Sequence, residues 1–501
     1  MSEVELKLQV PGAALAAVER ELARGATQRL RLQAIYFDTA DRRLAAAGLA
    51  LRVRKEGRHW VQTLKSGSAH GIERSEHDVP LALPAGREPA PDPALHGGTP
   101  PGDALAALLA AGGGPLLPQY RTDIWRRRRL QRSQRGTVEL ALDRGEITAT
   151  GADGQARRWP VCELEVELQR GDARAVTDVA ARWAVRHGLW LDTRGKAERG
   201  DRLSRGLGPG DPVPAAKAGP LRWRKAMTPA AAWQTLLDNL LAHALPNWSE
   251  VAGGSPAAEP VHQLRVALRR LRSAERFVAG WPGVAAGETA CAWADPAAAL
   301  FRRLGQARDS DVLAAGPQRE VDAALARIGE APLPLPTGPG APAWTDAERA
   351  RHGAVLLMLQ AAALLPPAAD GPPVLRTLAA ERLAEWHARL RRDAKRFAAL
   401  DDEARHRVRK RTKRLRYAVE FAAALFPRAT VEAYLAPLRE AQERLGEFND
   451  LCVAIAAYRP LTAEAPQAWF ALGVLAGRRE AALVRCAQAL ARWRKAEPFW
   501  R

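Results

Sequence analysis

The strongest constraint on the fold is an alternation of charged and apolar residues that begins at the third position. In Glu3-Val4-Glu5-Leu6-Lys7, two acids and a lysine are separated by two apolar residues. A β-strand has a period of two, so it would place the three charged side chains on one face and the apolar ones on the other. We therefore expect a strand with one face in a core and one charged face.

The charged face allows two interpretations. Charges that alternate with apolar residues are typical of a half-exposed edge strand, whose outer face is simply solvated. Alternatively, carboxylates about 7 Å apart along one strand face can hold hard divalent cations, and the lysine beyond them can hold an anion that such cations bring. The second interpretation predicts metal-assisted chemistry on phosphate.

The same alternation recurs through the first two hundred residues, where it is sorted by charge. Bases occupy one face in segments 51–55 and 126–128, a lysine ends segment 60–65, and acids share a face in segments 138–143 and 162–168. An ordinary antiparallel sheet points apolar residues inward and mixes both charge signs outside. A closed or nearly closed antiparallel barrel resolves the difference, because alternate residues then line a lumen that can hold a polar ligand. We therefore expect an N-terminal antiparallel β-barrel in an α+β protein.

A lumen with basic strands on one side and acidic strands on the other suits a polyphosphate chain bridged by a divalent metal ion. Arginine and lysine would neutralise the phosphates that do not react, and carboxylates would hold the ion that polarises the reacting one. Segment 195–200, Gly-Lys-Ala-Glu-Arg-Gly, adds basic groups near the end of this region.

An ordered set of motifs runs through residues 1–206. They are Glu3-x-Glu5-x-Lys7, Tyr36-Phe37-Asp38-Thr39, Arg52 with Arg54, Gln62-Thr63-Leu64-Lys65, Arg121-Thr122-Asp123-Ile124-Trp125-Arg126, Asp143-Arg144-Gly145, the Glu163/Glu165/Glu167 strand and Lys196-Ala197-Glu198-Arg199-Gly200. Together they resemble the CYTH domain, the triphosphate tunnel metalloenzymes that include class IV adenylate cyclases and thiamine triphosphatases. The order of motifs is most similar to the bacterial inorganic triphosphatase branch.

This resemblance implies site residues and a cofactor, Mg²⁺ or Mn²⁺. The implied metal ligands are Glu3, Glu5, Asp143, Glu163, Glu165 and Glu167. The implied substrate ligands are Lys7, Arg52, Arg54, Lys65, Arg126, Arg128, Lys196 and Arg199. The residues expected to act in catalysis are Glu3, Glu5, Lys7, Lys65 and Arg126. Three further arginines follow Arg126 where the family usually carries an aromatic residue, and a period of two selects Arg128 as its neighbour in the lumen, leaving Arg127 and Arg129 on an exposed face.

A run of glycine and proline at 206–214 separates this region from the rest of the chain, because no helix or strand crosses such a run. Beyond it, alanine, leucine and arginine recur at helical spacing. We expect a CYTH-like domain at 1–206, a linker at 207–222 and an all-α domain at 223–501, whose two repeats join near 329–348.

The helical part repeats itself. Segment 262–272 is answered by segment 406–416, and in both copies a histidine and bases fall at i, i+3, i+7 and i+10, on one helix face. About forty residues later each copy has a second signal, at 304–311 and at 445–450. The matched order predicts a duplicated helical bundle in which two basic helix faces lie near each other. The acids and Asn449 of the second signals are expected to orient the basic helix rather than to bind metal.

A basic helix face is most often simply solvated. Here few acids offset the bases, and such unbalanced charge repels itself unless an anion is bound. The repeats resemble the CHAD domain, a helical module associated with inorganic polyphosphate binding and found beside CYTH domains. The resemblance covers 223–501 and implies a polyphosphate surface formed by His262, Arg265, Arg269, Arg270, Arg272, His406, Arg409, Lys410, Lys413, Arg414 and Arg416.

Composition agrees with a polyanionic partner, since the formal net charge is +19. Charge alone does not separate nucleic acid from polyphosphate, and phosphate contacts carry no sequence information, so no specific nucleic acid is expected. The four cysteines, at 162, 291, 452 and 486, are too far apart to indicate disulfides or a zinc site. The charged N-terminus shows no secretory signal and the apolar run at 355–365 is too short to span a bilayer. We expect a cytoplasmic protein without a membrane partner, associated with polyphosphate granules.

The leading hypothesis is a metal-dependent triphosphatase that hydrolyses inorganic triphosphate to pyrophosphate and phosphate, with a helical domain that binds long-chain polyphosphate. One alternative is a polyphosphate-binding or targeting protein with a weak or sensory tunnel domain. Another is a triphosphatase that acts on thiamine triphosphate or nucleoside triphosphates. Cyclisation of ATP would need an adenine pocket, for which no aromatic or glycine-rich signature is visible. The oligomeric state stays open.

Overall fold

The computed structural model describes residues 2–67, 73–82, 89–112, 114–151, 153–284, 290–333, 344–365 and 374–501. It divides into two compact units. The sheet unit contains Met1–Lys217, Leu241–Gln263 and Trp344–Leu365. The helical unit contains Ala218–Leu240, Leu264–Ala343 and Pro366–Arg501. The units therefore do not follow the order of the chain, since two helical stretches from the later part pack with the sheet.

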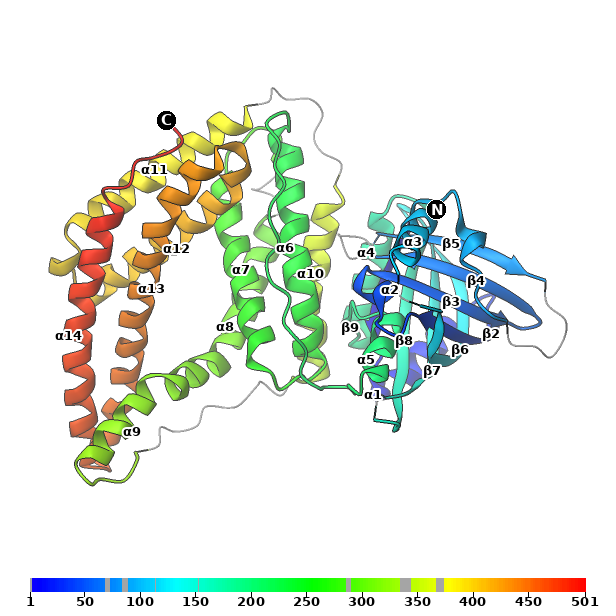
Figure 1. Cartoon of the computed structure of the whole chain (residues 1–501), viewed down its shortest axis with the longest axis horizontal. Coiled ribbons are helices and arrows are strands. Elements are labelled where there is room, and N and C mark those ends of the chain that lie inside the picture. The colour runs from blue at the N-terminus through cyan, green and yellow to red at the C-terminus, as the bar shows by residue number, and fades with distance from the viewer. Residues whose placement is uncertain are drawn as a thin grey trace. The chain divides into compact units, whose positions relative to one another are not determined.

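One antiparallel sheet forms the sheet unit, and Figure 1 colours its strands from blue to cyan. The order is β5-β4-β3-β2-β6-β7-β8-β1-β9. The bounds are β1 Ser2–Gln9, β2 Gln28–Asp38, β3 Leu49–Glu56, β4 His59–Ser66, β5 Glu73–Leu81, β6 Leu117–Ser133, β7 Gly136–Thr150, β8 Ala156–Gly171 and β9 Trp190–Leu191. The long β6–β7–β8 meander follows from the alternating patterns expected at 126–128, 138–143 and 162–168.

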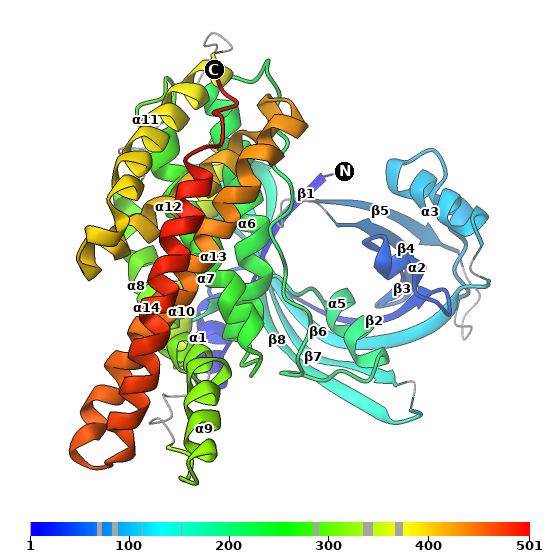
Figure 2. The ribbon, with the colours of Figure 1, turned by 60° about the vertical axis from the view of Figure 1, so that its left-hand side comes forward.

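The sheet curls until β1 lies beside β5 (Figure 2). These two strands pair only from Ser2 to Val4, whereas β1 pairs with β8 from Glu5 to Gln9. The short strand β9 takes up the other edge of β1 at Leu8 and Gln9. The expected antiparallel β structure is confirmed, but a closed barrel is not, because the edge of β1 that would complete it is shared between β5 and β9.

Helices cover parts of the curled sheet. Leu6 and Leu8 of β1 and Val166 of β8 are buried, and α4, which packs on both strands, buries Val179 and Trp183. The period of two that buries these apolar residues turns the charged residues of β1 to the inside of the curl. The helices of this unit that precede residue 217 are α1 Gly12–Leu22, α2 Arg43–Ala46, η1 Pro93–His96, α3 Pro100–Ala110, α4 Arg174–His187 and α5 Lys196–Ser204.

Two later helices complete the sheet unit. The helix α10, Asp346–Ala363, packs against α4 and β9. The helix α6, Pro229–Ala252, contributes its second half from Leu241 onward. Trp248 of α6 is fully buried and donates its Nε1–H to the carbonyl oxygen of Leu191, 3.0 Å away.

The helical unit is all-α, as expected. Its remaining helices are α7 Ala258–Val278, α8 Ala290–Ala315, α9 Pro317–Arg327, α11 Leu375–Lys395, α12 Asp402–Ala422, α13 Arg428–Tyr458 and α14 Gln467–Trp493. The two basic repeats lie on α7 and α12. Asp401 caps α12 by accepting a hydrogen bond from the Ala404 amide at 2.7 Å, which starts this highly charged helix at a fixed residue.

Aromatic packing holds the two repeats together inside the helical unit. Phe277 at the end of α7 contacts Trp386 of α11 and Phe421 of α12, with ring centroids 5.8 and 6.3 Å apart. Such ring pairs contribute beyond the area that they bury. Within the described part of the chain, we find no helix with both the length and the apolar character needed to cross a bilayer.

Candidate active site

A cavity of about 530 Å³ lies inside the curled sheet. Both charge signs line it, and they come from seven strands and α5. The lining bases are Lys7, Arg52, Arg54, Lys65, Arg126, Arg128 and Lys196. The lining acids are Glu3, Glu5, Glu56, Glu76, Asp78, Glu139, Asp143, Glu165 and Glu167. Most residues selected from the sequence are therefore brought into one space, although they are spread over nearly two hundred positions.

The opening motif of the chain forms part of the wall. Glu5 and Lys7 are both 7% exposed and form an ion pair with each other on the inner face of β1. Glu3 forms an ion pair with Lys65 of β4, whose Nζ lies 3.3 Å from Oε2 of Glu3. These side chains point into the cavity, and Leu6 and Leu8 are buried on the opposite face of β1. The strand is therefore not a solvated edge strand.

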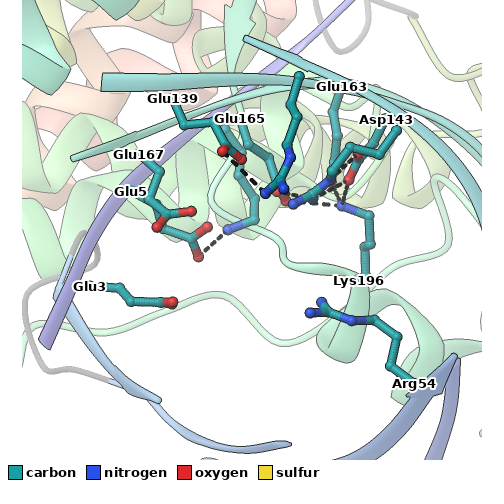
Figure 3. A network of polar contacts seen from close by, with 12 residues as sticks. Glu3, Glu5, Arg54, Glu139, Asp143, Glu163, Glu165, Glu167 and Lys196 are labelled. Carbon is teal, nitrogen blue, oxygen red and sulfur yellow. Dashed lines mark hydrogen bonds and ion pairs between the residues drawn. The ribbon is translucent and has the colours of Figure 1, made fainter. Parts of the chain in front are cut away.

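An acidic cluster lies around the ammonium group of Lys196 (Figure 3). Ligand oxygens of Asp143, Glu163 and Glu165 lie within 4.8 Å of one another. Lys196 Nζ is 2.6 Å from Oδ2 of Asp143 and 2.9 Å from Oε1 of Glu165, and it also pairs with Glu163. Arg126 donates two hydrogen bonds of 2.7 Å to Asp143. These carboxylates are therefore compensated by cations of the protein itself.

The same cations set the protonation of Glu165. Burial would raise the pKa of Glu165, but Lys196 and Arg126 outweigh it and hold that pKa well below its usual range. The acids in turn raise the pKa of Lys196 above its usual value, although burial opposes this. The carboxylate of Glu165 is thus ionised and the ammonium of Lys196 is charged at neutral pH.

A second group of acids in the cavity has less compensation. Figure 3 shows Glu3, Glu5, Glu139 and Glu167 on the side of the cavity away from Lys196. Burial, a hydrogen bond with Glu76 and the charge of neighbouring carboxylates raise the pKa of Glu3 to about 8. Burial and the charges of Glu139 and Glu5 raise the pKa of Glu167 to about 7. Burial and the neighbouring acids therefore favour the protonated forms of these two carboxyl groups, and a divalent cation would favour their ionised forms.

Several lining residues were missed by the sequence reasoning. Glu76 of β5 lies with one oxygen 3.2 Å from Nη2 of Arg52, and it pairs with Lys65. Burial would raise the pKa of Glu76, but Arg52 and Lys65 hold it below its usual range. The signal was the alternation of Arg74, Glu76 and Asp78, which places both acids on one strand face. The other missed lining residues that carry polar groups are Tyr36, Glu56, Thr122, Glu139 and Gln169.

The arginine run on β6 follows the period of two. Arg126 and Arg128 line the cavity, whereas neither Arg127 nor Arg129 does. Arg129 points to the other face, where its Nη1 donates to the Arg24 carbonyl oxygen at 2.6 Å. The expected choice of Arg128 as the neighbour of Arg126 in the lumen agrees with this arrangement.

Two predicted site residues do not reach the cavity. Arg199 of α5 is 1% exposed and Glu163 of β8 is fully buried, and the two form an ion pair with each other. Glu163 also pairs with Lys196. Glu163 belongs to the acidic cluster with Asp143 and Glu165, and α5 packs on β8, the strand that carries it. The roles of Arg199 as a substrate ligand and of Glu163 as a metal ligand stay predictions.

The helical unit brings the two basic repeats together. Lys413 of α12 is largely buried near Arg409 and Arg416 of the same helix, Arg269 of α7 and Asp450 of α13. Burial and the positive charge of these arginines lower the pKa of Lys413 to about 6, while Asp450 opposes the shift. Positive charge from both copies is therefore concentrated at one place, as the repeated pattern predicted.

Other members of the predicted polyphosphate surface have different surroundings. Arg270 is 5% exposed and donates to Asn239 Oδ1 at 3.0 Å, so it is more deeply buried than a fully solvated surface arginine. Arg265 stacks over the Phe301 ring at 4.5 Å. His406 Nδ1 lies 3.3 Å from Asn449 Oδ1, so here the second signal does contact the basic helix.

The remaining members also divide by helix. His262 and Arg272 lie on α7, and Lys410, Arg414 and Arg416 lie on α12. Burial and the charge of Arg276 lower the pKa of Arg414 to about 10. The side chains of residues 306–315, which include the acids of the first repeat's second signal, lie outside the described residues.

Comparisons with known proteins address both parts of the chain. Residues 1–200 match the family model of the CYTH domain, and residues 235–459 match that of the CHAD domain. The inorganic triphosphatase of Haemophilus influenzae is 28% identical over 206 residues, which cover 40% of this chain and 54% of that protein. The chain thus spans about half the length of this curated relative.

Two solved structures resemble parts of the chain. The CHAD domain from the plant Ricinus communis is 29% identical, covers 56% of this chain and 96% of its own, and has a TM-score of 0.39. A Hippeastrum protein described as having a dominant triphosphatase activity is 19% identical, covers 41% of this chain and 96% of its own, and has a TM-score of 0.29.

Proposed function

The chain carries a CYTH domain followed by a CHAD domain, and on this premise we propose that it is a metal-dependent triphosphatase. Its reaction is the hydrolysis of inorganic triphosphate to pyrophosphate and phosphate, and its helical part binds long-chain polyphosphate. The similarity to a curated inorganic triphosphatase supports a hydrolase of phosphoric anhydride bonds. Binding to polyphosphate would also bring the enzyme to polyphosphate granules.

The observation that carries this proposal is the gathering of many bases and many acids within one cavity. Arg52, Arg54 and Lys65 project from β3 and β4, while Asp143 and Glu165 project from β7 and β8. Figure 3 shows Arg54 across the cavity from the acidic cluster. Triphosphate is a short chain of closely spaced negative charges, so the bases of the cavity can hold its phosphates while the acids hold the cation that accompanies it.

The donor set fits Mg²⁺ or Mn²⁺. Both ions prefer hard oxygen ligands, and among the described residues that line the cavity the acids supply carboxylate oxygens, with no histidine or cysteine beside them. The raised pKa values of Glu3 and Glu167 show that burial and neighbouring acids disfavour their ionised forms, which a divalent cation would stabilise. The ion would be held by Glu3, Glu5, Glu165 and Glu167. Asp143, which pairs with Lys196, would be a further ligand. A bound ion of this kind polarises phosphate oxygens and lowers the pKa of an attacking water.

The residues of the chain supply the rest of the reaction. Lys7, Lys65 and Arg126 bind phosphate oxygens and offset the negative charge that develops as the anhydride bond breaks. The buried position of Lys7 and the two hydrogen bonds between Arg126 and Asp143 fix these cations before substrate arrives. Positioning and charge neutralisation are most of what phosphoryl transfer requires from a protein.

A phosphate-release panel tests the proposal. The substrates are inorganic triphosphate, thiamine triphosphate, ATP and long-chain polyphosphate, each with Mg²⁺, with Mn²⁺ and with EDTA. We expect the highest kcat/KM with inorganic triphosphate and no turnover with EDTA. A higher kcat/KM with thiamine triphosphate or ATP would move the assignment to an organic triphosphate, and turnover that EDTA leaves unchanged would contradict metal dependence.

A second candidate function is polyphosphate binding or targeting, with a weak or sensory tunnel. The concentration of charge around Lys413 favours it, because cations from two repeats gather there with Asp450 as the opposing charge. Retention of long-chain polyphosphate by the full chain, with duplex DNA as competitor, tests this function. Equal competition by DNA would instead indicate general affinity for phosphate backbones.

A further inference from the structure

The second half of α6 is attached to the segment that carries Lys196. The amide of Thr193 donates to Ser249 Oγ at 2.9 Å, and Trp248 Nε1 donates to the Leu191 carbonyl oxygen at 3.0 Å. Ser249 and Trp248 are fully buried. These contacts hold α6 against residues 190–193, the stretch that leads from β9 into α5.

Glu250 adds a charged contact to the same segment. It is 4% exposed, and its Oε1 accepts a hydrogen bond of 2.8 Å from Nη2 of Arg202 in α5. Its Oε2 lies 3.7 Å from Nη1 of Arg194, just before α5. Arg194 and Arg202 are themselves 6% and 8% exposed. Arg202 also pairs with Glu198 and Arg194 with Asp192, so Glu250 is the acid that joins the two arginines, one before α5 and one within it. Removing a buried partner weakens such a network.

A chain of polar contacts continues from Arg194 to Lys196. Arg194 donates from Nε and Nη2 to the two oxygens of Asp192, at 2.9 and 2.8 Å. Asp192 accepts from Gln9 Nε2 at 3.2 Å, and Gln9 Nε2 also lies 3.4 Å from Oε2 of Glu163. Glu163 pairs with Lys196. A displacement of Arg194 would therefore change the position of the Lys196 ammonium group, which faces the cavity.

A second cavity places Glu250 next to the site. This space of about 400 Å³ is lined by Pro246 and Glu250 of α6. It is also lined by Lys65 and Ala197, both of which line the charged cavity inside the sheet as well. Glu250 thus lines the second cavity, whereas Lys196 lines the charged cavity inside the sheet.

We propose that Glu250 is a positioning residue for the triphosphatase reaction, which holds α5 in place and through it orients Lys196 toward substrate. Glu250 lies within the stretch that matches the CHAD domain, whereas Lys196 lies within the stretch that matches the CYTH domain. One helix of the CHAD part is therefore a working component of the CYTH site. This inference rests on the proposed function.

The kinetic test compares full-length Glu250→Gln with wild type and with Glu259→Gln. Glutamine keeps the shape of Glu250 and removes its charge. Glu259 is an exposed acid at the start of α7, which makes it a matched control. We expect Glu250→Gln to raise KM for triphosphate about tenfold with a smaller change in kcat, and Glu259→Gln to match wild type. An unchanged KM in folded Glu250→Gln would overturn the inference.

A double-mutant cycle shows whether Glu250 acts through Lys196. In a Lys196→Ala background, Glu250→Gln should cause no further rise in KM, because the group that it positions is gone. Fully additive effects would overturn the inference. If Glu250→Gln does not fold, Arg202→Gln removes the other end of the same contact and takes its place in the cycle.

Hydrogen exchange gives a readout that does not depend on turnover. Amide exchange in residues 196–204 should be faster in Glu250→Gln than in wild type, and unchanged in Glu259→Gln. If wild type releases no phosphate from triphosphate with either metal, the proposed function fails, whereas exchange still reports on the restraint of α5. Equal exchange in all three proteins would overturn that restraint.

Discussion

The ammonium group of Lys196 lies 2.9 Å from Oε1 of Glu165, so a cation of the protein occupies the acidic cluster that sequence reasoning had assigned to metal. Asp143 and Glu163 contact the same ammonium group. The acids with raised pKa values, Glu3 and Glu167, lie elsewhere in the cavity. The cavity therefore contains two acidic groups, one that pairs with Lys196 and Arg126 and one whose members Glu3 and Glu167 have raised pKa values.

Glu5→Gln should remove metal-dependent turnover and leave the fold intact. The change deletes one carboxylate oxygen from the candidate metal ligands, while the amide keeps the shape of the side chain. We expect kcat/KM for triphosphate to fall at least about 100-fold. Phosphate release and thermal melting measure the two effects. Glu146→Gln, which changes an acid on β7 that pairs with exposed Arg158, is the control, and turnover by folded Glu5→Gln at the wild-type rate would contradict the assignment.

Arg126→Ala should lower the activity strongly and Arg127→Ala should barely change it, although the two residues are adjacent. Arg126 lines the cavity and is held by Asp143, whereas Arg127 does not line it. Removing a cation that binds phosphate should lower kcat/KM about 100-fold, and removing its neighbour should change it less than about twofold. Steady-state kinetics on both variants measure this, and similar losses in the two would show that the run acts as a general basic surface.

The metal-free protein should become less stable as pH rises from about 4.5 to about 8 because of Glu3. Its pKa is raised from 4.5 to about 8, so over this window the folded protein binds a proton that the unfolded chain has released. The contribution is fully present below the lower value and is lost above the upper one. Melting temperature against pH in EDTA, compared between wild type and Glu3→Gln, measures it. Parallel curves for the two proteins would contradict the raised pKa.

The same ionisation should control metal affinity. Only the deprotonated carboxylates bind a divalent ion, so the Mg²⁺ concentration that gives half-maximal activity should fall as pH rises through 7 to 8, where Glu167 and Glu3 lose their protons. Activity titrations with Mg²⁺ at a series of pH values measure this. A half-maximal concentration that stays constant across the window would rule out these two acids as ligands.

Polyphosphate binding should strengthen as pH falls through about 6. The pKa of Lys413 is lowered to about 6, so below this value the cluster gains a positive charge beside Arg409 and Arg416. His406, whose pKa is lowered by burial and by Lys410, adds to the same trend. Binding isotherms of wild type and Lys413→Met at pH 5 and pH 8 separate the contribution of Lys413 from that of His406. Lys495→Met changes an exposed lysine and should behave as wild type, and an equal pH effect in Lys413→Met would exclude Lys413 as its source.

Much of the site was visible in local spacing. The alternation that begins at Glu3 predicted a strand with a charged inner face, and a period of two separated Arg126 and Arg128 from Arg127 and Arg129. The repeated histidine and arginine pattern predicted that two basic helices would meet, as Arg269 and Lys413 do. These features succeeded because the direction of a side chain in a strand or helix depends only on its position along the element.

The strand pattern did not show which end of a strand is covered. Glu163 and Glu165 share a face of β8, yet Glu165 lines the cavity while Glu163 is buried with Arg199. The difference comes from α5, which packs over one end of the strand. In the same way, Arg270 was grouped with the basic surface, yet its side chain is buried and donates to Asn239 of α6.

Local spacing along the chain was enough to establish the charged strand faces and the two basic helical repeats, because each follows from short-range periodicity and charge. Only the tertiary structure decided that Lys196 fills the acidic cluster, that the sheet stops short of closure and that Glu250 of α6 pairs with Arg202 of α5. The physical reason is that these outcomes depend on which buried charges meet across long separations in the chain, and a buried charge is stable only beside the partner that packing brings to it.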